Sequence, residues 1–170
     1  MNLQYNAEAD EHILVCLSSA PSNSKIIRTA AKMADAFSGN FTALYIETPG
    51  FASLDETNKK RLKQNMKLAR QLGAKVETVS GDDVPYQIAE FARLSGVTKI
   101  VIGRSAAVKR HLIRKPTLTE KLIEHAPNID IHIIPDGVEV THYEAPVPKK
   151  NIKIRFSFHD FIVSVGLLIA

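Results

Sequence analysis

The sequence predicts an α/β fold, a doubly wound sheet of five parallel strands with helices on both faces. The first observation is a repeated alternation of short apolar runs with amphipathic stretches of helical period. The second is that the apolar runs are four to six residues long and nearly all apolar, as expected for strands buried on both faces. The third is that Gly, Pro or Ser separates most of the segments. Flavodoxin-like layering with right-handed crossovers follows from this order.

The first three elements are expected between residues 12 and 46. His12–Leu17 is an apolar run that ends in Ser-Ser-Ala-Pro, as a buried strand ends in a loop. Ser22 or Asn23 is expected to cap a helix that Gly39 ends. Phe41–Ile46 then predicts the second strand.

The remaining elements continue the alternation. They are a helix at Ser53–Leu72 with a basic outer face, a strand at Lys75–Val79, a helix at Val84–Leu94, a strand at Lys99–Ile102, a helix at Thr117–His125 and a strand at Ile129–Ile134. In open sheets of this kind, ligands bind beyond the carboxyl ends of the strands, where the strand order reverses. Candidate site residues are therefore expected after the first and fourth strands.

Composition excludes several classes of protein. With 170 residues, the chain has room for one domain and an appendage. Its 45% hydrophobic and 24% charged residues are typical of globular domains, which excludes disorder, collagen and coiled coil. The 22 basic and 18 acidic side chains give a net charge of +4 and are dispersed, so a nucleic-acid polymer is not an expected partner.

The cysteine content and the start of the sequence indicate a reducing compartment. Cys16 is the single cysteine and lies inside an apolar run, so a buried structural thiol is expected. Residues 1–10 are polar and mildly acidic, unlike a secretion signal. The folded part is therefore expected to be cytoplasmic.

The character of the sequence changes after the predicted domain, which we place at residues 11–136. Residues 137–155 contain Pro146 and Pro148 and end in a basic flank, so they are expected to be a juxtamembrane linker. Residues 156–170 are mostly apolar and are interpreted as the start of a truncated transmembrane helix, because about 20 apolar residues are needed to span a bilayer. The alternative is an amphipathic or core helix.

A candidate anion-binding loop follows the fourth strand. Gly103-Arg104-Ser105-Ala106 is followed by nine residues and then by Pro116-Thr117. This spacing resembles the triphosphate loop of the universal stress protein family, whose fold is adenine nucleotide α-hydrolase-like. Gly103 and Thr117 match that loop, while Ala106 and Pro116 replace its other two glycines. Because Pro116 removes an N–H donor, ATP is expected to bind weakly.

Basic side chains in the same loop offer another way to hold an anion. Arg104 and the positions that follow it supply positive charge: Lys109, Arg110, His111, Arg114 and Lys115. The alternative is a solvated basic loop without a ligand.

A narrower resemblance is to the KdpD family of sensor histidine kinases. It rests on Ser105 after Gly103-Arg104, on the helix that ends in His-Ala-Pro, and on the basic flank before FSFHDF. The resemblance covers about residues 11–170 and implies a sensory domain placed before four transmembrane helices. It implies a role in a two-component system that controls potassium uptake at the inner or plasma membrane.

The KdpD resemblance also implies a ligand. Some members bind cyclic di-AMP through Ser-x-Ser, twenty residues, then Phe-Thr-Ala-x-Tyr, and this chain matches that spacing with Ala20 in place of the second serine. The implied ligand-binding residues are Ser18, Ser19, Ala20, Phe41, Thr42, Ala43, Tyr45, Gly103, Arg104, Ser105 and Thr117. The alternative for Phe41 and Tyr45 is that they only pack within the strand.

Binding or sensing is expected rather than catalysis. The chain has no Walker A loop, phosphoacceptor-histidine helix or ATP lid, and its six histidines lack metal-ligand spacing, so no cofactor or metal is expected. The expected partners are the rest of the kinase, a nucleotide messenger, the membrane, and another universal stress protein or a second copy. The alternatives are a free-standing universal stress protein that binds ATP and a small nucleotide-hydrolysing enzyme, although no general base is expected beside Gly103.

Overall fold

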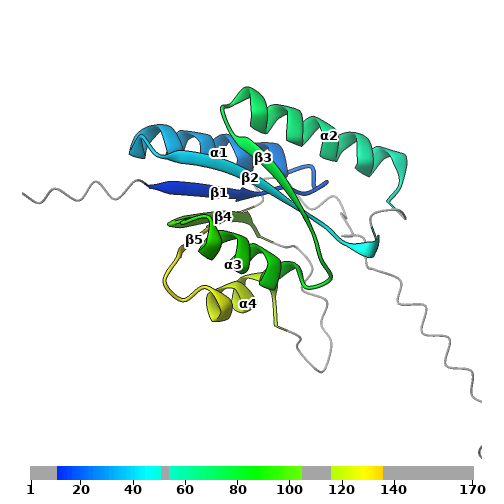
Figure 1. Cartoon of the computed structure of the whole chain (residues 1–170). Coiled ribbons are helices and arrows are strands. Elements are labelled where there is room, and N and C mark those ends of the chain that lie inside the picture. Colours follow the sequence, from blue (N-terminus) through cyan, green and yellow to red (C-terminus); the bar gives the residue numbers. More distant parts are fainter. Residues whose placement is uncertain (1–10, 51–53, 105–115, 136–170) are drawn as a thin grey trace, which may run out of the picture.

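The computed structural model describes residues 11–50, 54–104 and 116–135. Within these residues, strands and helices alternate as the sequence predicts (Figure 1). The elements are β1 (His12–Cys16), α1 (Asn23–Phe37), β2 (Asn40–Glu47), α2 (Glu56–Gln71), β3 (Lys75–Ser80), α3 (Val84–Leu94), β4 (Lys99–Gly103), α4 (Leu118–His125) and β5 (Asp130–Ile134).

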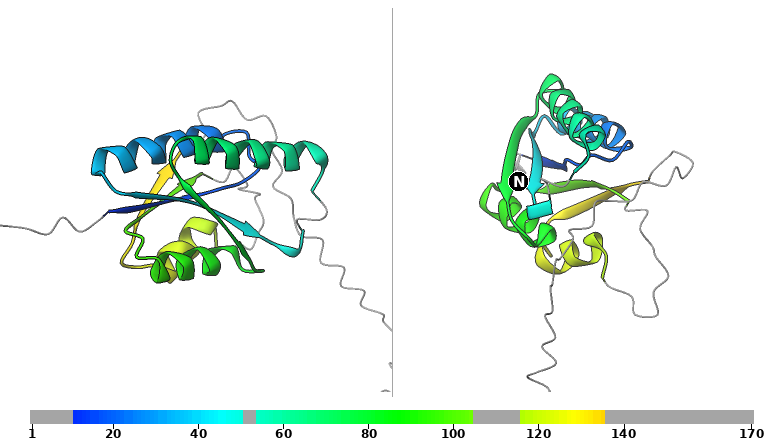
Figure 2. Two further views of the ribbon diagram at one scale, coloured as in Figure 1. Left: turned by 45° about the horizontal axis from the view of Figure 1, so that its top comes forward. Right: turned by 90° about the vertical axis from the view of Figure 1, so that its right-hand side faces the viewer.

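The five strands form one parallel sheet in the order β3-β2-β1-β4-β5, which confirms the doubly wound fold. Helices α1 and α2 cover one face of the sheet, and α3 and α4 cover the other (Figures 1 and 2). The strand order reverses direction between β1 and β4, which pair with each other although they are far apart in sequence. The carboxyl ends of β2, β1 and β4 are therefore neighbours, at the position where ligands bind in such sheets.

The sheet separates two apolar cores. Alternate residues of β1 face opposite cores, so Ile13 and Val15 pack under α1 and α2 while Leu14 packs against α3 and α4. All three side chains are fully buried. This two-sided burial explains why the central strands are almost wholly apolar in the sequence.

The end of α1 differs from the expectation. Ser38, not Gly39, adopts the left-handed conformation that ends the helix, with φ of 51°. Gly39 donates its N–H to the carbonyl of Ala34 at 2.9 Å. A Cβ at Gly39 would collide with the backbone carbonyl of Glu11. Gly39 is thus required for the close approach of two chain segments, rather than for the turn itself.

Helix α2 begins later than residue 53, the expected start. Asp55 caps it, because the Asp55 carboxylate accepts a hydrogen bond from the Asn58 N–H at 2.8 Å. Helix α3 has the expected bounds, and Asp83 caps it through the N–H of Tyr86 at 3.2 Å. The acidic residue before α3 therefore caps the first turn of the helix.

Several expectations fall outside the described residues. These are Ser105, the basic positions 109–115, the domain end at residue 136, the linker at 137–155 and the apolar segment at 156–170. Among the residues that are described, no helix is both long enough and apolar enough to cross a membrane.

Candidate functional site

The loop between β1 and α1, residues 17–22, lies at the carboxyl end of β1 and is called here the first loop. Asn23 holds it from within, with a side chain that is only 2% exposed. The Asn23 amide donates from Nδ2 to the carbonyl of Cys16 at 3.0 Å. Its Oδ1 accepts from the N–H of Ser18 at 3.1 Å. Asn23 therefore fixes the exit of β1 rather than capping α1 with its side chain.

Two side chains of α2 hold the first loop from outside. Asn65, which is 5% exposed, donates from Nδ2 to the carbonyl of Ser18 at 2.9 Å. Arg61 donates from Nη1 to the carbonyl of Ser19 at 3.0 Å and to Oδ1 of Asn58 at 3.3 Å. Two side chains that lie about one turn apart on α2 thus fix the geometry of this loop.

The predicted ligand residues of the first loop are partly occupied by local hydrogen bonds. Ser18 Oγ accepts from the N–H of Ala20 at 3.3 Å, and the Ala20 carbonyl accepts from the N–H of Asn23 at 3.1 Å. Ser19 is buried, at 6% exposure, whereas Ser18 and Ala20 are half-buried. The structure therefore places Ser18 and Ala20 where a ligand at this edge of the sheet can reach them.

The predicted residues of β2 do not all reach the same edge. Tyr45 follows Leu44, which pairs with the last residue of β1, so Tyr45 lies level with the start of the first loop. Phe41 pairs with Ile13 and lies about four residues, or about 13 Å, nearer the amino-terminal end. Both aromatic side chains pack against the core under α1 and α2.

Thr42 and Ala43 are committed to the interior. Ala43 is fully buried, and Thr42 is 5% exposed. The Thr42 hydroxyl lies 2.8 Å from Nε2 of His12, whose Nδ1 lies 3.0 Å from the carbonyl of Ser95. The side chains of Thr42 and His12 therefore stabilise the amino-terminal half of the sheet.

The end of β4 supplies the third segment of the candidate site. Gly103 ends β4 beside Ile134, and the N–H of Arg104 donates to the Ile134 carbonyl at 3.0 Å. The Arg104 side chain is exposed. A Cβ at Gly103 would collide with Cδ1 of Ile26, so this glycine also allows α1 to pack closely on β4.

Thr117 begins α4 through a capping box. Its hydroxyl accepts from the N–H of Glu120 at 3.2 Å, and the Glu120 carboxylate accepts from the Thr117 N–H at 2.7 Å. Thr117 thus has a local structural role at the position that matches the phosphate-binding loop.

The thiol of Cys16 does not add a nucleophile to this site. Desolvation by the surrounding apolar groups raises the pKa of the Cys16 thiol to about 12. It is therefore neutral at physiological pH, and its side chain packs against the core under α3 and α4.

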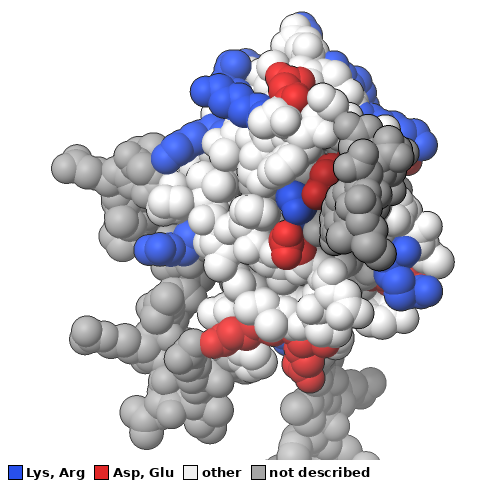
Figure 3. Space-filling view, turned by 90° about the vertical axis from the view of Figure 1, so that its left-hand side faces the viewer, with Lys and Arg blue, Asp and Glu red and all other residues white. Residues whose placement is uncertain are grey.

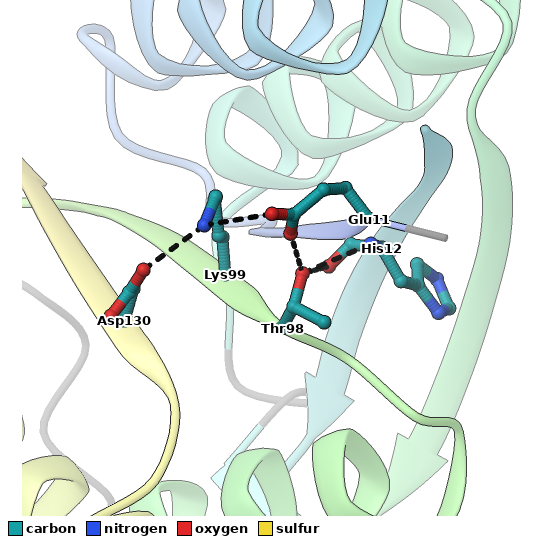
Figure 4. Close-up of polar contacts among 5 residues, drawn as sticks. All are labelled: Glu11, His12, Thr98, Lys99 and Asp130. Carbon is teal, nitrogen blue, oxygen red and sulfur yellow. Dashed lines mark hydrogen bonds and ion pairs between the residues drawn. The ribbon is translucent and has the colours of Figure 1, made fainter. Parts of the chain in front are cut away.

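The opposite edge of the sheet, at the amino-terminal ends of the strands, carries a network of charged and polar groups (Figure 3). Lys99 Nζ lies 3.0 Å from Asp130 and 3.3 Å from Glu11 (Figure 4). Thr98 donates a hydrogen bond to Glu11 and accepts one from the His12 N–H at 3.1 Å. We call these five residues the amino-end network.

The amino-end network shifts the pKa values of its members in the direction that stabilises their charges. The hydrogen bond from Thr98, and then Lys99, lower the pKa of Glu11. The hydrogen bond from Lys99 lowers the pKa of Asp130, and the same bond raises the pKa of Lys99. Lys99 is only 13% exposed and also lies 5.2 Å from the centroid of the Phe37 ring.

The sequence interpretation considered Asn23 only as a possible helix cap, and it missed Asn65 and Arg61. A signal for Asn65 was available, because it lies among Leu62, Met66 and Ala69 on the apolar face of its helix. A polar residue on such a face needs a buried partner. Arg61 lacked a comparable signal, because it is one of several basic residues in α2.

The fold is shared with solved universal stress proteins. A universal stress protein solved in complex with cAMP has a TM-score of 0.56 and 15% identity, with 75% of this chain and 98% of that chain covered. The universal stress protein from Archaeoglobus fulgidus has a TM-score of 0.54 and 19% identity, with 72% and 97% covered. The described residues therefore form a universal-stress-protein-like α/β domain.

Sequence comparison narrows the class. No protein-family model matches the chain. The chain is 33% identical over 162 residues to the sensor protein KdpD of Clostridium acetobutylicum, covering 93% of this chain and 18% of that protein. It is 30% identical over 118 residues to the sensor protein KdpD of Escherichia coli K12, covering 69% and 13%. The chain thus fits the universal-stress-protein-like domain of KdpD sensor proteins, and it spans less than a fifth of either relative's length.

Proposed function

We propose that this chain is the nucleotide-sensing domain of a KdpD-type sensor histidine kinase that controls potassium uptake, and that its ligand is cyclic di-AMP. The observation that carries the proposal is the convergence of the first loop, Tyr45 and Arg104 at the carboxyl ends of three neighbouring strands. This is where a doubly wound sheet receives a ligand.

The first loop supports the proposal because side chains fix its backbone. Bonds from Asn23, Asn65 and Arg61 satisfy the carbonyls of residues 16, 18 and 19. A loop held in this way loses little conformational entropy when a ligand binds. The complex of a related fold with cAMP is consistent with an adenine nucleotide as the ligand class.

The whole protein would be a membrane-attached kinase, with the described domain on the cytoplasmic side. The proposed partners of the domain are the transmembrane and catalytic parts of that kinase, and either a second copy or another universal stress protein. The replacement of two loop glycines by Ala106 and Pro116 favours this reading over a free-standing stress protein that binds ATP.

Titration calorimetry of the 170-residue chain tests the proposal. Cyclic di-AMP is expected to bind, and ATP is expected to bind more weakly. Cyclic di-GMP is expected to bind more weakly still, because a site that contacts the adenine base distinguishes two messengers of equal charge. Arg104→Ala is expected to lower affinity for cyclic di-AMP about ten-fold or more. Ala20→Ser, which restores the second serine, is expected to preserve or improve affinity.

Arg93→Ala is the matched control, since Arg93 is exposed and, among the described residues, forms its ion pair with Glu90 of its own helix at 2.6 Å. Equal binding of the two cyclic dinucleotides would contradict a base-reading site. Absence of binding of all three ligands at millimolar concentration would leave the domain a protein-interaction module.

A further inference from the structure

Arg61 has an unusual electrostatic environment. Its side chain is half-buried on α2, yet no carboxylate within the described residues pairs with it. Its recorded partners are a backbone carbonyl, of Ser19, and a side-chain amide, of Asn58. A guanidinium placed in this way is positioned by neutral oxygens and keeps its full positive charge.

The pattern of bonds leaves one edge of the guanidinium available. Both recorded bonds originate from Nη1. The N–H groups of Nε and Nη2 point in nearly parallel directions and have no recorded partner among the described residues. Such a pair of donors matches two oxygens of a phosphate in a bidentate arrangement.

Arg61 also lies on the correct side of the sheet. Helix α2 begins on the side where β1 and β2 end (Figure 1), and Arg61 is bonded to the first loop itself. Tyr45 packs on the same face of the sheet as α1 and α2. Tyr45 and Arg61 therefore lie on the same face of the sheet, both beside the first loop.

We propose that Arg61 is a phosphate-binding residue of the nucleotide site, with Nη1 holding the Ser19 carbonyl and the Nε–Nη2 edge receiving a phosphodiester. This inference rests on the proposed function, because it requires a nucleotide at the first loop. Asn58 is the positioning residue, since its Oδ1 fixes the plane of the guanidinium.

The test combines titration calorimetry with ³¹P NMR of cyclic di-AMP bound to the whole chain. Arg61→Ala is expected to lower affinity about ten-fold or more. Arg61→Gln keeps an N–H donor for the Ser19 carbonyl but removes the charge, and it is expected to lose nearly as much affinity. At saturating ligand, a ³¹P resonance that shifts on binding to the parent chain is expected to move back toward its free position in both variants.

Arg70→Ala is the matched control, because Arg70 is an exposed arginine in the last turn of the same helix. It is expected to leave affinity and the ³¹P spectrum unchanged. Affinities of Arg61→Gln and the parent within two-fold, or an unchanged ³¹P shift in the variants, would overturn the role of Arg61 and leave the proposed function standing. Failure of the parent chain to bind cyclic di-AMP at millimolar concentration would overturn the proposed function and this inference together.

Discussion

The two edges of the sheet at which the strands begin and end, here called the amino-terminal and carboxyl-terminal edges, differ in the hydrogen-bond partners of their polar side chains. At the amino-terminal edge, charged side chains pair with one another, as Lys99 does with Glu11 and Asp130. At the carboxyl-terminal edge, side chains bond to the backbone of the first loop, and the charge of Arg61 has no carboxylate partner among the described residues. The cation of the first edge is neutralised by two carboxylates, whereas Arg61 at the second edge has no such partner in the part of the chain that the structure describes.

This difference separates a structural cluster from a candidate binding site in a way that residue type alone does not. Both edges contain basic and hydroxyl side chains. Charges that neutralise each other stabilise the fold but attract a charged ligand only weakly. Donors that bond to loop carbonyls instead fix the conformation of the loop, and the charge of Arg61 beside it has no carboxylate partner within the described segments. Four experiments test this contrast.

The largest expected effect is at the carboxyl-terminal edge. Asn23→Ala is expected to lower the free energy of unfolding by about 2–4 kcal/mol, because it removes the partners of two backbone groups, each worth about 1–3 kcal/mol when buried and unpaired. Urea denaturation provides the measurement. Ser22→Ala is the control, because Ser22 makes no side-chain capping bond, and a change below about 0.5 kcal/mol is expected there. Equal effects of the two variants would show that the first loop does not depend on Asn23.

The next effect is at the amino-terminal edge. Lys99→Met is expected to lower the free energy of unfolding by about 1–2 kcal/mol, because it leaves two neighbouring carboxylates without their cation. Affinity for cyclic di-AMP is expected to stay unchanged, since the substitution lies at the opposite end of the sheet. In the control Lys75→Met, the lost interaction is the exposed ion pair with Glu77 at 2.8 Å, so a much smaller loss of stability than in Lys99→Met is expected. Loss of ligand affinity in Lys99→Met would contradict the separation of the two edges.

A smaller effect distinguishes two roles of Gly103, which are to allow the packing of Ile26 and to bind the proposed ligand. Gly103→Ala is expected to destabilise the protein by about 1 kcal/mol, because Ile26 must move from the new Cβ. In an Ile26→Val background, which removes the colliding Cδ1, the same substitution is expected to cost almost nothing. A ligand-affinity loss that persists in the double variant would assign Gly103 to the binding site, and an undiminished stability loss would rule out Ile26 as the cause.

The smallest effect is a pH dependence of the amino-end network. The folded-state pKa values of Glu11 and Asp130 are lowered, so their contribution to stability is present above their unfolded values, near about 4, and is lost as pH falls through the folded values. The stability difference between the parent and Lys99→Met is therefore expected to be smaller at pH 3 than at pH 7. A difference that is independent of pH would show that Lys99 acts through its apolar stem and its contact with Phe37.

The fold was predictable because each element carries a local signal. The central strands are apolar on both faces, and Asp83 precedes an amphipathic run, so their identities and order follow from periodicity and capping. The end of α1 was misassigned to Gly39 because glycine is the usual left-handed residue, while the true requirement at Gly39 is a contact with residue 11. That contact joins segments separated by a whole helix, which periodicity does not register.

The candidate site was predictable only in outline. The sequence analysis treated Phe41–Tyr45 as one ligand-binding unit. In the structure, Thr42 contacts His12, because side chains alternate between the two faces of β2. Only Tyr45, near the end of the strand, lies level with the first loop. The supporting role of α2 was missed because its contacts with the first loop span more than forty positions in sequence. Which basic residue of a helix faces a loop depends on packing, and the sequence pattern does not specify it.

The central position of β1 also has a mechanical consequence. This strand is hydrogen-bonded to β2 on one side and to β4 on the other, and all three run parallel. A tensile force applied to the chain at residue 11 and resisted at the carboxyl edge would act along β1. It would load the bonds to both neighbours in shear, so many would have to break together, whereas the same force pulling an edge strand sideways would open its bonds one at a time.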